Sequence, residues 1–344
     1  QSLNNILIVA PAPMVVDWEV NRFGGHPSPV HAVTFDDDGK RLATGDSNGL
    51  VKLWDLDTNT EIRSLTGHNN MVNALAFSPD GTRLAAAANC QDVRIWNTQT
   101  GESVCKSIDH PGPVKSVAFS PDGSKIATGS TDDAVRLLDA DTGQLVKQFF
   151  GCKADIESVT FLPDGIRVMA LGRNDNMIRI WDIGTGRQLK PLAAPNAWLT
   201  SFIVSPDGDH TAARDFSGKV YQWDTDSGRR LGGFSVGGSS SPHLLAYSPD
   251  GRQLLSADWP NVQLHDASSG RVVCTFKGHT GSLTALTFSP DGDTVVTAGN
   301  DNTVRLWEVP TNLRHSRPAV HEHSRILDFG PNRLLDGGTG PADE

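Results

Sequence analysis

A four-residue turn sequence recurs along the chain at an almost constant interval. Five copies read Ser-Pro-Asp-Gly and two related copies keep the same frame, at residues 36–39, 78–81, 120–123, 162–165, 205–208, 248–251 and 289–292. Their closing glycines are 42, 42, 42, 43, 43 and 41 residues apart. A fixed period of this size indicates one supersecondary unit repeated side by side, because a single unit cannot bury its apolar faces alone.

Each unit carries the pattern of several short strands. In the second unit, apolar side chains recur over residues 72–77, 83–86 and 93–96, with turn residues between the segments. Pro presets φ for a turn and Gly supplies a positive φ, so the Pro-Asp-Gly step is expected to reverse the chain between antiparallel strands. A further turn and strand follow, which makes four strands per unit. No segment shows helical periodicity, and an all-β fold is predicted.

Two further markers keep step with the turns. An apolar-Trp-Asp step or a near relative occurs once per unit, and its tryptophans are Trp54, Trp96, Trp181, Trp223 and Trp307. Gly-His pairs open several units, at residues 25–26, 67–68 and 278–279. On these markers the chain resembles the WD-repeat (Trp-Asp repeat) family of β-propellers over essentially its whole length. The resemblance implies a ring of four-stranded antiparallel blades and a typical role in protein interaction.

The two ends of the chain favour an eighth blade. Residues 329–338 resemble the first and second strands of a unit, and residues 5–10 and 15–23 resemble a third and a fourth strand. We therefore expect one propeller domain over residues 1–344, with eight blades and the last shared by both termini. The expected blades cover approximately residues 26–67, 68–109, 110–151, 152–194, 195–237, 238–278 and 279–320, and the closing blade covers 321–344 plus 1–25. The alternative is a seven-bladed ring closed by residues 17–23 as an outer strand, with residues 312–344 as a tail.

The resemblance also implies a buried hydrogen-bonded tetrad in individual blades, made by a His, a Ser or Thr, an Asp and the Trp. The matching residues of the last complete unit are His279, Thr297, Asp301 and Trp307. In the first unit, the same spacing puts Asn48 where the Asp is expected. Ser or Thr, His and Asp also describe a nucleophilic triad. A network that recurs with the structural period is better explained as part of the scaffold, so no catalytic residue is predicted.

Composition limits the partners and the compartment. With 30 Lys and Arg against 40 Asp and Glu, the formal charge is −10, which argues against nucleic acid as the main partner. No apolar stretch approaches the roughly 18 residues of a membrane span. The 4 cysteines include no CxxC pair, and His321 and His323 have no evident third ligand, so neither a metal site nor a cofactor is predicted. We expect a monomeric cytoplasmic domain.

The resemblance places binding on the narrow face around the central channel. That face is formed by the turn before each first strand and the turn after each second strand. The candidate binding residues there are His31, Met71, Lys115, Asp155, Glu157, Trp198, His243, Trp259 and Arg325. Aromatic side chains beside carboxylates suit a partner with Arg, Lys or an exposed apolar plug. Filling of gaps between blades is an equal alternative for Trp198 and Trp259.

The predicted function is a non-catalytic scaffold that binds a protein or peptide. Propellers of the family often accompany kinase, NTPase or protease domains, which makes the regulatory or sensor domain of a larger bacterial signalling protein a compatible context. The competing class is an enzyme with an active site at the mouth of the channel. Its candidate groups would be His31, Asp155, Glu157 and His243.

Overall fold

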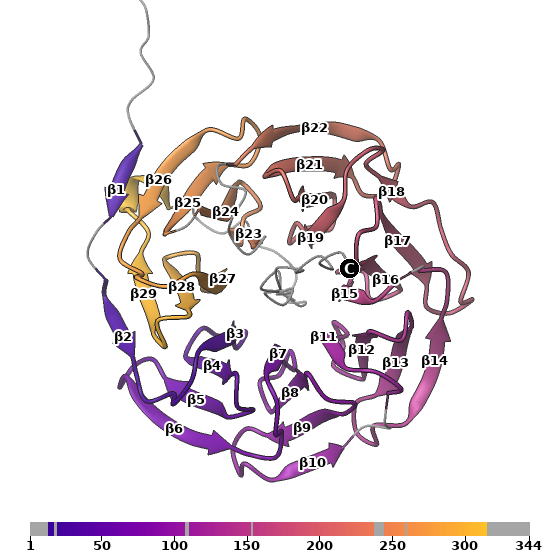
Figure 1. Ribbon diagram of the computed structural model, residues 1–344, viewed down its shortest axis with the longest axis horizontal. Coiled ribbons are helices and arrows are strands. Elements are labelled where there is room, and N and C mark those ends of the chain that lie inside the picture. The colour runs from indigo at the N-terminus through magenta and orange to yellow at the C-terminus, as the bar shows by residue number, and fades with distance from the viewer. Residues whose placement is uncertain are drawn as a thin grey trace, which may run out of the picture.

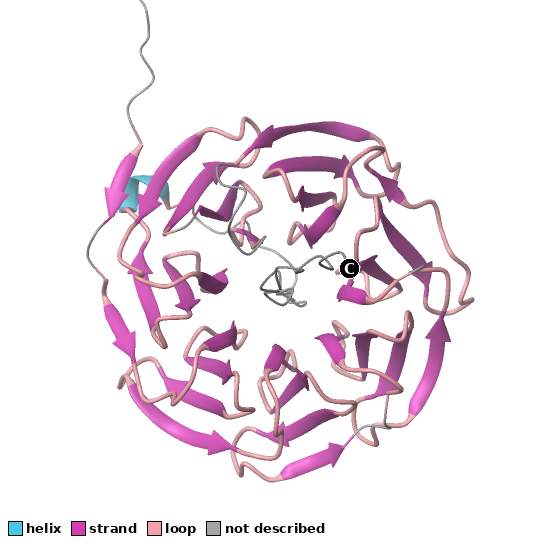
Figure 2. Ribbon diagram, in the orientation of Figure 1, coloured by secondary structure: helices cyan, strands magenta, loops and turns pink. Residues whose placement is uncertain are grey.

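A computed structural model of the chain describes residues 13–16, 19–106, 110–152, 154–236, 244–258 and 260–314. They form seven separate sheets, arranged as blades around a central axis (Figure 1). Apart from the short 3-10 helix η1 (Thr311–Leu313), the regular elements of this described part are strands (Figure 2). The prediction of an all-β propeller with four-stranded antiparallel blades is confirmed, whereas the preferred number of eight blades is wrong.

Five blades consist of four consecutive strands. Blade one contains β3 (Val30–Phe35), β4 (Arg41–Asp46), β5 (Val51–Asp55) and β6 (Thr60–Leu65). Blade two contains β7 (Val72–Phe77), β8 (Arg83–Ala88), β9 (Val93–Asn97) and β10 (Ser103–Lys106). Blade three contains β11 (Val114–Phe119), β12 (Lys125–Ser130), β13 (Val135–Asp139) and β14 (Leu145–Phe149). Blade four contains β15 (Ile156–Phe161), β16 (Arg167–Gly172), β17 (Met177–Asp182) and β18 (Leu192–Ala193). Blade five contains β19 (Leu199–Val204), β20 (His210–Asp215), β21 (Lys219–Asp224) and β22 (Arg230–Ser235).

The other two blades include strands from the N-terminal region. Blade six contains β23 (Leu245–Tyr247), β24 (Gln253–Asp258), β25 (Asn261–Asp266) and β26 (Val272–Phe276), with β1 (Met14–Val16) added in parallel beside β26. Blade seven contains β27 (Leu283–Phe288), β28 (Thr294–Gly299), β29 (Val304–Glu308) and, on its outer edge, β2 (Asn21–Phe23). The ring is therefore closed by pairing of an early strand with a late one.

The register of β2 explains why the eight-blade prediction failed. Asn21 pairs with Leu306 and Phe23 pairs with Val304, so the strand expected to complete an eighth blade completes the seventh. The ring of Phe23 then packs 5.1 Å from that of Trp54 in blade one. A seven-bladed ring and an eight-bladed ring both need an outer strand just before the first Gly-His pair. The sequence pattern of that strand therefore does not distinguish the two rings. Residues 5–10 and 321–344, which suggested the eighth blade, lie outside the described residues.

Neighbouring blades pack closely because small residues stand where one blade faces the inner strand of the next. A Cβ added to Gly45 in blade one would lie 2.6 Å from Cγ1 of Val72 in blade two. A Cβ on Gly129 in blade three would lie 2.5 Å from Cγ2 of Ile156 in blade four. Separations this short exclude any larger residue unless the facing side chain of the next blade moves. The inner ends of the blades are thereby held in a fixed relation to the channel.

Candidate functional site

A hydrogen-bonded tetrad lies at one end of blade seven. His279 Nδ1 is 2.9 Å from Asp301 Oδ2 and its Nε2 is 2.7 Å from Thr297 Oγ1. Trp307 Nε1 donates to the same hydroxyl at 2.8 Å. Burial alone would raise the pKa of Asp301, but hydrogen bonds from His279 and Thr303 hold it well below its usual range. The polar atoms of this set are directed at one another, which is the arrangement of a structural clamp.

Blade one contains the same network with a different carboxylate. His26 Nε2 is 2.7 Å from Thr44 Oγ1, which also accepts from Trp54 Nε1 at 2.8 Å. The carboxylate 3.1 Å from His26 Nδ1 is that of Asp46, the last residue of β4, and not a side chain at position 48. The tetrad Asp therefore stands at the end of the second strand in blade one and in the turn after the second strand in blade seven. Spacing alone could not identify it.

Blade three has Leu138 in place of the tetrad Trp, and an arginine joins its His to its Asp. Arg136 Nη1 donates to His110 Nδ1 at 2.8 Å and to Asp132 Oδ1 at 3.0 Å. The other ring nitrogen, His110 Nε2, is 3.2 Å from Thr128 Oγ1. Burial and, next, the charge of Arg136 lower the pKa of His110 to about 4. His110 is therefore neutral at neutral pH and accepts the hydrogen bond from the guanidinium.

The top face is the end of the ring where each first strand begins and each second strand ends. In five blades, the N–H of the residue after the second strand donates to the C=O of the residue before the first strand. These donor and acceptor residues are Ser47 and Pro29, Asn89 and Met71, Thr131 and Pro113, Arg173 and Asp155, and Asn300 and Ser282. Each of these five blades therefore presents one pair of neighbouring residues on the top face. The side chains of the pair give each blade its surface chemistry.

Three of the predicted binding residues lie on blades one to three. His31 is half-buried in β3, with Nε2 2.7 Å from Ser47 Oγ, and burial lowers its pKa. Lys115 in β11 is only 5% exposed, and its Nζ donates to Asn89 Oδ1 at 2.9 Å. Met71 is partly exposed before β7. The ammonium group of Lys115 is thus occupied by a contact between blades two and three.

Blade four carries the predicted carboxylates. Asp155 and Glu157 are both partly exposed, before and within β15. Arg173 Nη1 lies 4.0 Å from Asp155 Oδ2, a cation that the sequence analysis did not single out. An exposed pair at this distance stabilises the fold by little. Blade four therefore presents charges of both signs on the top face.

Blade five presents two aromatic side chains at the ends of one strand pair. Trp198 precedes β19 and is 65% exposed, and Phe216 follows β20 and is 46% exposed. Leu199 and Asp215, the residues next to them, are partners in the ladder, so both aromatics leave the sheet at the same end. The sequence analysis identified Trp198 and missed Phe216. The repeat register could have found it, because Phe216 stands 43 residues before Trp259, as Gly208 stands before Gly251.

The segment that carries Trp198 is tied to blade four. The backbone N–H of Leu199 donates to the C=O of Asp175 at 2.9 Å, two residues after Arg173. The aromatic pair of blade five is therefore adjacent to the charged pair of blade four. The remaining predicted residues, His243, Trp259 and Arg325, lie outside the described residues.

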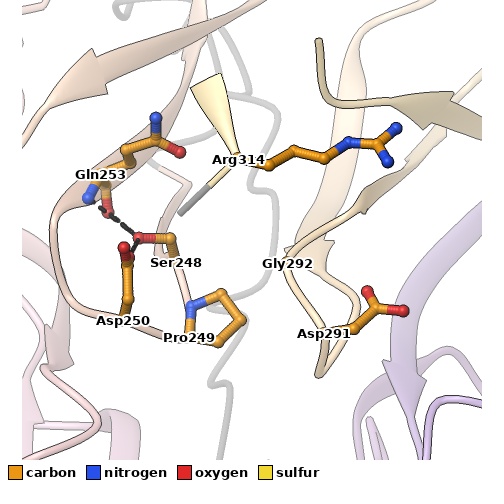
Figure 3. Close-up of a pocket in the computed structure, with 7 residues that line it drawn as sticks. All are labelled: Ser248, Pro249, Asp250, Gln253, Asp291, Gly292 and Arg314. Carbon is orange, nitrogen blue, oxygen red and sulfur yellow. Dashed lines mark hydrogen bonds between the residues drawn. The ribbon is translucent and has the colours of Figure 1, made fainter. Parts of the chain in front are cut away.

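A small pocket lies at the opposite end of the ring, between blades six and seven (Figure 3). It is lined by Ser248, Pro249, Asp250, Gln253, Asp291, Gly292 and Arg314. Its volume of about 10 Å³ is close to the space of a single water molecule. Such a pocket does not accommodate an organic substrate.

The sequence repeat, the ring of seven sheets and the recurring tetrad agree with matches to two family models. A model described as the IFT122 first beta-propeller matches residues 18–239, and one described as the WD domain, G-beta repeat, matches residues 270–308. The chain belongs to the WD-repeat β-propellers. Members of this family are typically non-catalytic scaffolds for protein interaction.

Curated relatives match over shorter stretches. The chain is 37% identical over 86 residues to the target of rapamycin complex subunit wat1 of Schizosaccharomyces pombe, covering 23% of this chain and 27% of the relative. It is 43% identical over 65 residues to the WD repeat-containing protein sll1491 of Synechocystis, covering 19% of each chain. It is 44% identical over 50 residues to human pre-mRNA-processing factor 19, covering 14% of this chain and 10% of the relative. Each match thus spans only about a quarter or less of the relative's length, one or two blades.

Among the residues that the structure describes, no helix could span a lipid bilayer.

Proposed function

We propose that this WD-repeat propeller is a non-catalytic interaction module that holds a protein or peptide on its top face, with Trp198 and Phe216 as anchors. The observation that carries the proposal is the exposure of two large aromatics at the end of one strand pair. Single exposed apolar residues are normal on protein surfaces. Two neighbouring aromatics on the binding face of a rigid scaffold are typical of interface hot spots.

The neighbouring blade supports a choice of partner chemistry. Asp155 and Glu157 lie on blade four, beside the segment that carries Trp198. A partner that inserts an apolar side chain between the aromatics can place an Arg or Lys toward these carboxylates, and an acidic group toward Arg173. We expect an extended peptide segment with an apolar anchor flanked by charged residues.

The geometry of the described residues gives no support to the enzyme alternative. His31 lies on blade one and Asp155 and Glu157 lie on blade four, across the ring from it (Figure 1). The tetrads of blades one and seven direct their polar atoms at one another, with the tryptophan on one side. General acid–base catalysis needs groups within hydrogen-bond reach of one reacting atom. We therefore propose binding without catalysis.

The wider context remains a proposal of the same kind. An acidic ring suits a monomeric cytoplasmic domain that regulates an attached kinase, NTPase or protease in a bacterial signalling protein. The coding sequence on either side of this segment tests that proposal. An adjoining catalytic domain is expected, and a gene that encodes the propeller alone would contradict it.

Affinity capture from the native cell, followed by mass spectrometry, tests the top-face proposal. The wild type is compared with the double variant Trp198→Ala and Phe216→Ala, and with Ile166→Ala as the matched control. Ile166 is 59% exposed but lies at the opposite end of blade four, after the Pro-Asp-Gly turn. Loss of a hot-spot aromatic typically costs about 2 kcal/mol or more, which is a tenfold or greater loss of affinity.

The expected result is that the double variant loses the partners that the wild type and the control both retain, while its thermal unfolding is unchanged. Capture of the same proteins by the folded double variant would contradict the proposal.

A further inference from the structure

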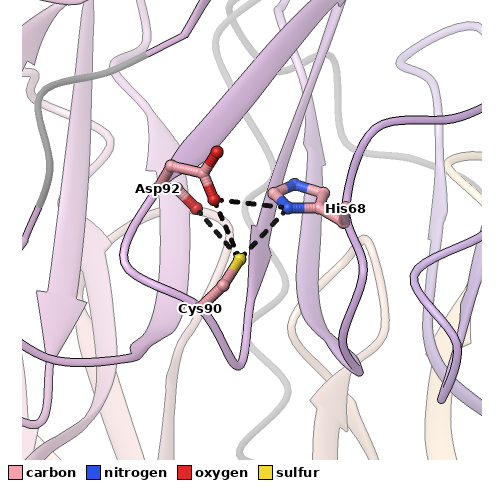
Figure 4. A group of neighbouring side chains, drawn as sticks. All are labelled: His68, Cys90 and Asp92. Carbon is pink, nitrogen blue, oxygen red and sulfur yellow. Dashed lines mark hydrogen bonds and ion pairs between the residues drawn. The ribbon is translucent and has the colours of Figure 1, made fainter.

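Blade two departs from the tetrad in a way that creates a different site. At the position of the tetrad Thr it has Ala86, and at the position of the tetrad Asp it has Cys90. His68 Nδ1 is 3.3 Å from Cys90 Sγ, and Cys90 Sγ is 2.9 Å from Asp92 Oδ1 (Figure 4). The distance from His68 Nδ1 to Asp92 Oδ1 is 3.7 Å. A nitrogen, a sulfur and an oxygen therefore surround one point.

The missing hydroxyl fixes the direction of the imidazole. His68 Nε2 lies 3.2 Å from the backbone oxygen of Ala86, and a carbonyl can only accept. Nε2 therefore carries a hydrogen, and in the neutral ring Nδ1 turns its lone pair toward Cys90 and Asp92. Metal-binding histidines show this arrangement, in which the second ring nitrogen donates to a backbone carbonyl or a carboxylate. In blades one and seven the partner of this ring nitrogen is a Thr hydroxyl, which also accepts from the Trp. In blade two the partner is the backbone carbonyl of Ala86, which orients His68 as a metal ligand.

We propose that His68, Cys90 and Asp92 bind a Zn²⁺ ion through Nδ1, Sγ and Oδ1. Zn²⁺ bonds of about 2.0–2.3 Å in tetrahedral geometry separate neighbouring ligand atoms by about 3.3–3.6 Å. The His68–Cys90 and His68–Asp92 distances already lie within a few tenths of an ångström of this range, and the Cys90–Asp92 distance must open by roughly half an ångström. Thiolate, imidazole and carboxylate together are a ligand set that Zn²⁺ prefers.

Charge and access agree with the assignment. A thiolate and a carboxylate balance the two charges of the ion, and the other oxygen of Asp92 is 3.5 Å from Arg94 Nε. The side chain of His68 is fully buried, whereas Cys90 is partly exposed and leaves a path from the top face. Without an ion, the S–H hydrogen of Cys90 lies beside two acceptors, His68 Nδ1 and Asp92 Oδ1. Binding of the ion releases that hydrogen to water as a proton, and three coordinate bonds, to sulfur, nitrogen and oxygen, form in its place.

The same geometry excludes a cysteine protease type of triad. In such a triad the two nitrogens of the imidazole face the nucleophile and the carboxylate separately. Here Cys90 and Asp92 both approach Nδ1, and Nε2 is held by Ala86. An ion in this place would join the loop before β7 to the turn after β8, which is the connection that the tetrad makes in blades one and seven. The site is therefore assigned a structural role, with one coordination position open to water.

The test is titration of the full-length, chelator-treated protein with ZnCl₂ alone, with free zinc followed by a competing indicator dye. Substitution by Co²⁺ gives a second readout, because a thiolate–cobalt charge-transfer band reports a bond to sulfur. The variants are Cys90→Ser and Asp92→Asn. The matched control is Cys105→Ser, since Cys105 lies in β10 of the same blade outside the cluster.

We expect about one equivalent of Zn²⁺ to bind to the wild type and to Cys105→Ser, and to raise the midpoint of thermal unfolding of both. Cys90→Ser should bind more than about tenfold more weakly and lose the cobalt band, and Asp92→Asn should bind at least about tenfold more weakly. The proposal is overturned if the folded wild type binds no zinc under these conditions. It is equally overturned if Cys90→Ser binds zinc as tightly as the wild type.

Discussion

The side-chain amide of Asn73 donates a 2.6 Å hydrogen bond to the backbone oxygen of Val114, across the boundary between blades two and three. Thr284 holds the equivalent position in blade seven, and its hydroxyl donates to the backbone oxygen of Val30 in blade one. Both bonds are buried and run from the second residue of an innermost strand to the first residue of the next. They join adjacent blades directly at the channel, where the top face begins.

Replacement of this bridge should loosen the boundary between blades two and three. Asn73→Ala removes the donor to the Val114 oxygen in a site where Asn73 is 1% exposed. A buried acceptor without a donor costs about 1–3 kcal/mol of unfolding free energy. Asn73→Thr should recover part of the loss, because a hydroxyl makes the equivalent bond in blade seven. Urea unfolding of the three proteins measures the effect, and an alanine variant as stable as the wild type would contradict it.

The tetrad of blade seven should depend on one hydroxyl. Thr297→Val keeps the shape of the side chain but removes the hydroxyl that accepts from Trp307 Nε1 and bonds to His279 Nε2. We expect the free energy of unfolding to fall by about 2–4 kcal/mol, since two buried polar groups lose one partner.

The control for this variant is Thr294→Val, on the same strand and partly exposed. It should change stability by less than about 0.5 kcal/mol, as surface substitutions usually do. Equal effects of the two variants would show that the hydroxyl of Thr297 has no special role.

Stability should depend on pH through His110. The pKa of His110 is lowered from 6.5 to about 4 by burial and by Arg136, so the unfolded chain binds more protons than the folded chain between these values. The free energy of unfolding therefore decreases as the pH falls from about 6.5 to about 4. This one group accounts for roughly 2 kcal/mol of loss between pH 7.5 and pH 5.

Comparison with His110→Gln isolates that contribution, because carboxylates titrate in both proteins. The stability of the wild type relative to the variant should fall by that amount between pH 7.5 and pH 5. A difference that does not change with pH would show that His110 is not held neutral.

Much of the architecture follows from the sequence because its signals are local. The Pro-Asp-Gly turn needs a positive φ at its last residue, and Gly81 has φ +67° with its N–H bonded to the Ser78 oxygen. The Trp residues and the apolar alternation then assign strands to each unit. Local signals of this kind determine the blade, because a four-stranded sheet is built from hairpins.

The number of blades and the chemistry of the top face depend on longer-range relations. The pairing of Asn21 with Leu306 joins residues from the two ends of the ring, and a strand of three residues has too little pattern to show its partner. Phe216 was missed since an aromatic residue in a turn resembles a packing residue until its exposure is known. The site in blade two was missed because His68, Cys90 and Asp92 have no metal-binding spacing and meet only after the blade has folded.

Ring closure can be measured directly by two truncations. The seven described sheets begin at Met14, and closure depends on β2, so a chain that starts at residue 13 should keep the cooperative thermal unfolding and the midpoint of the wild type. A chain that starts at residue 25 lacks β2 and should unfold at a clearly lower temperature, because blade seven loses its outer strand and Trp54 loses its contact with Phe23. Unfolding or aggregation of the first truncation would contradict a ring of seven blades closed by residues 21–23.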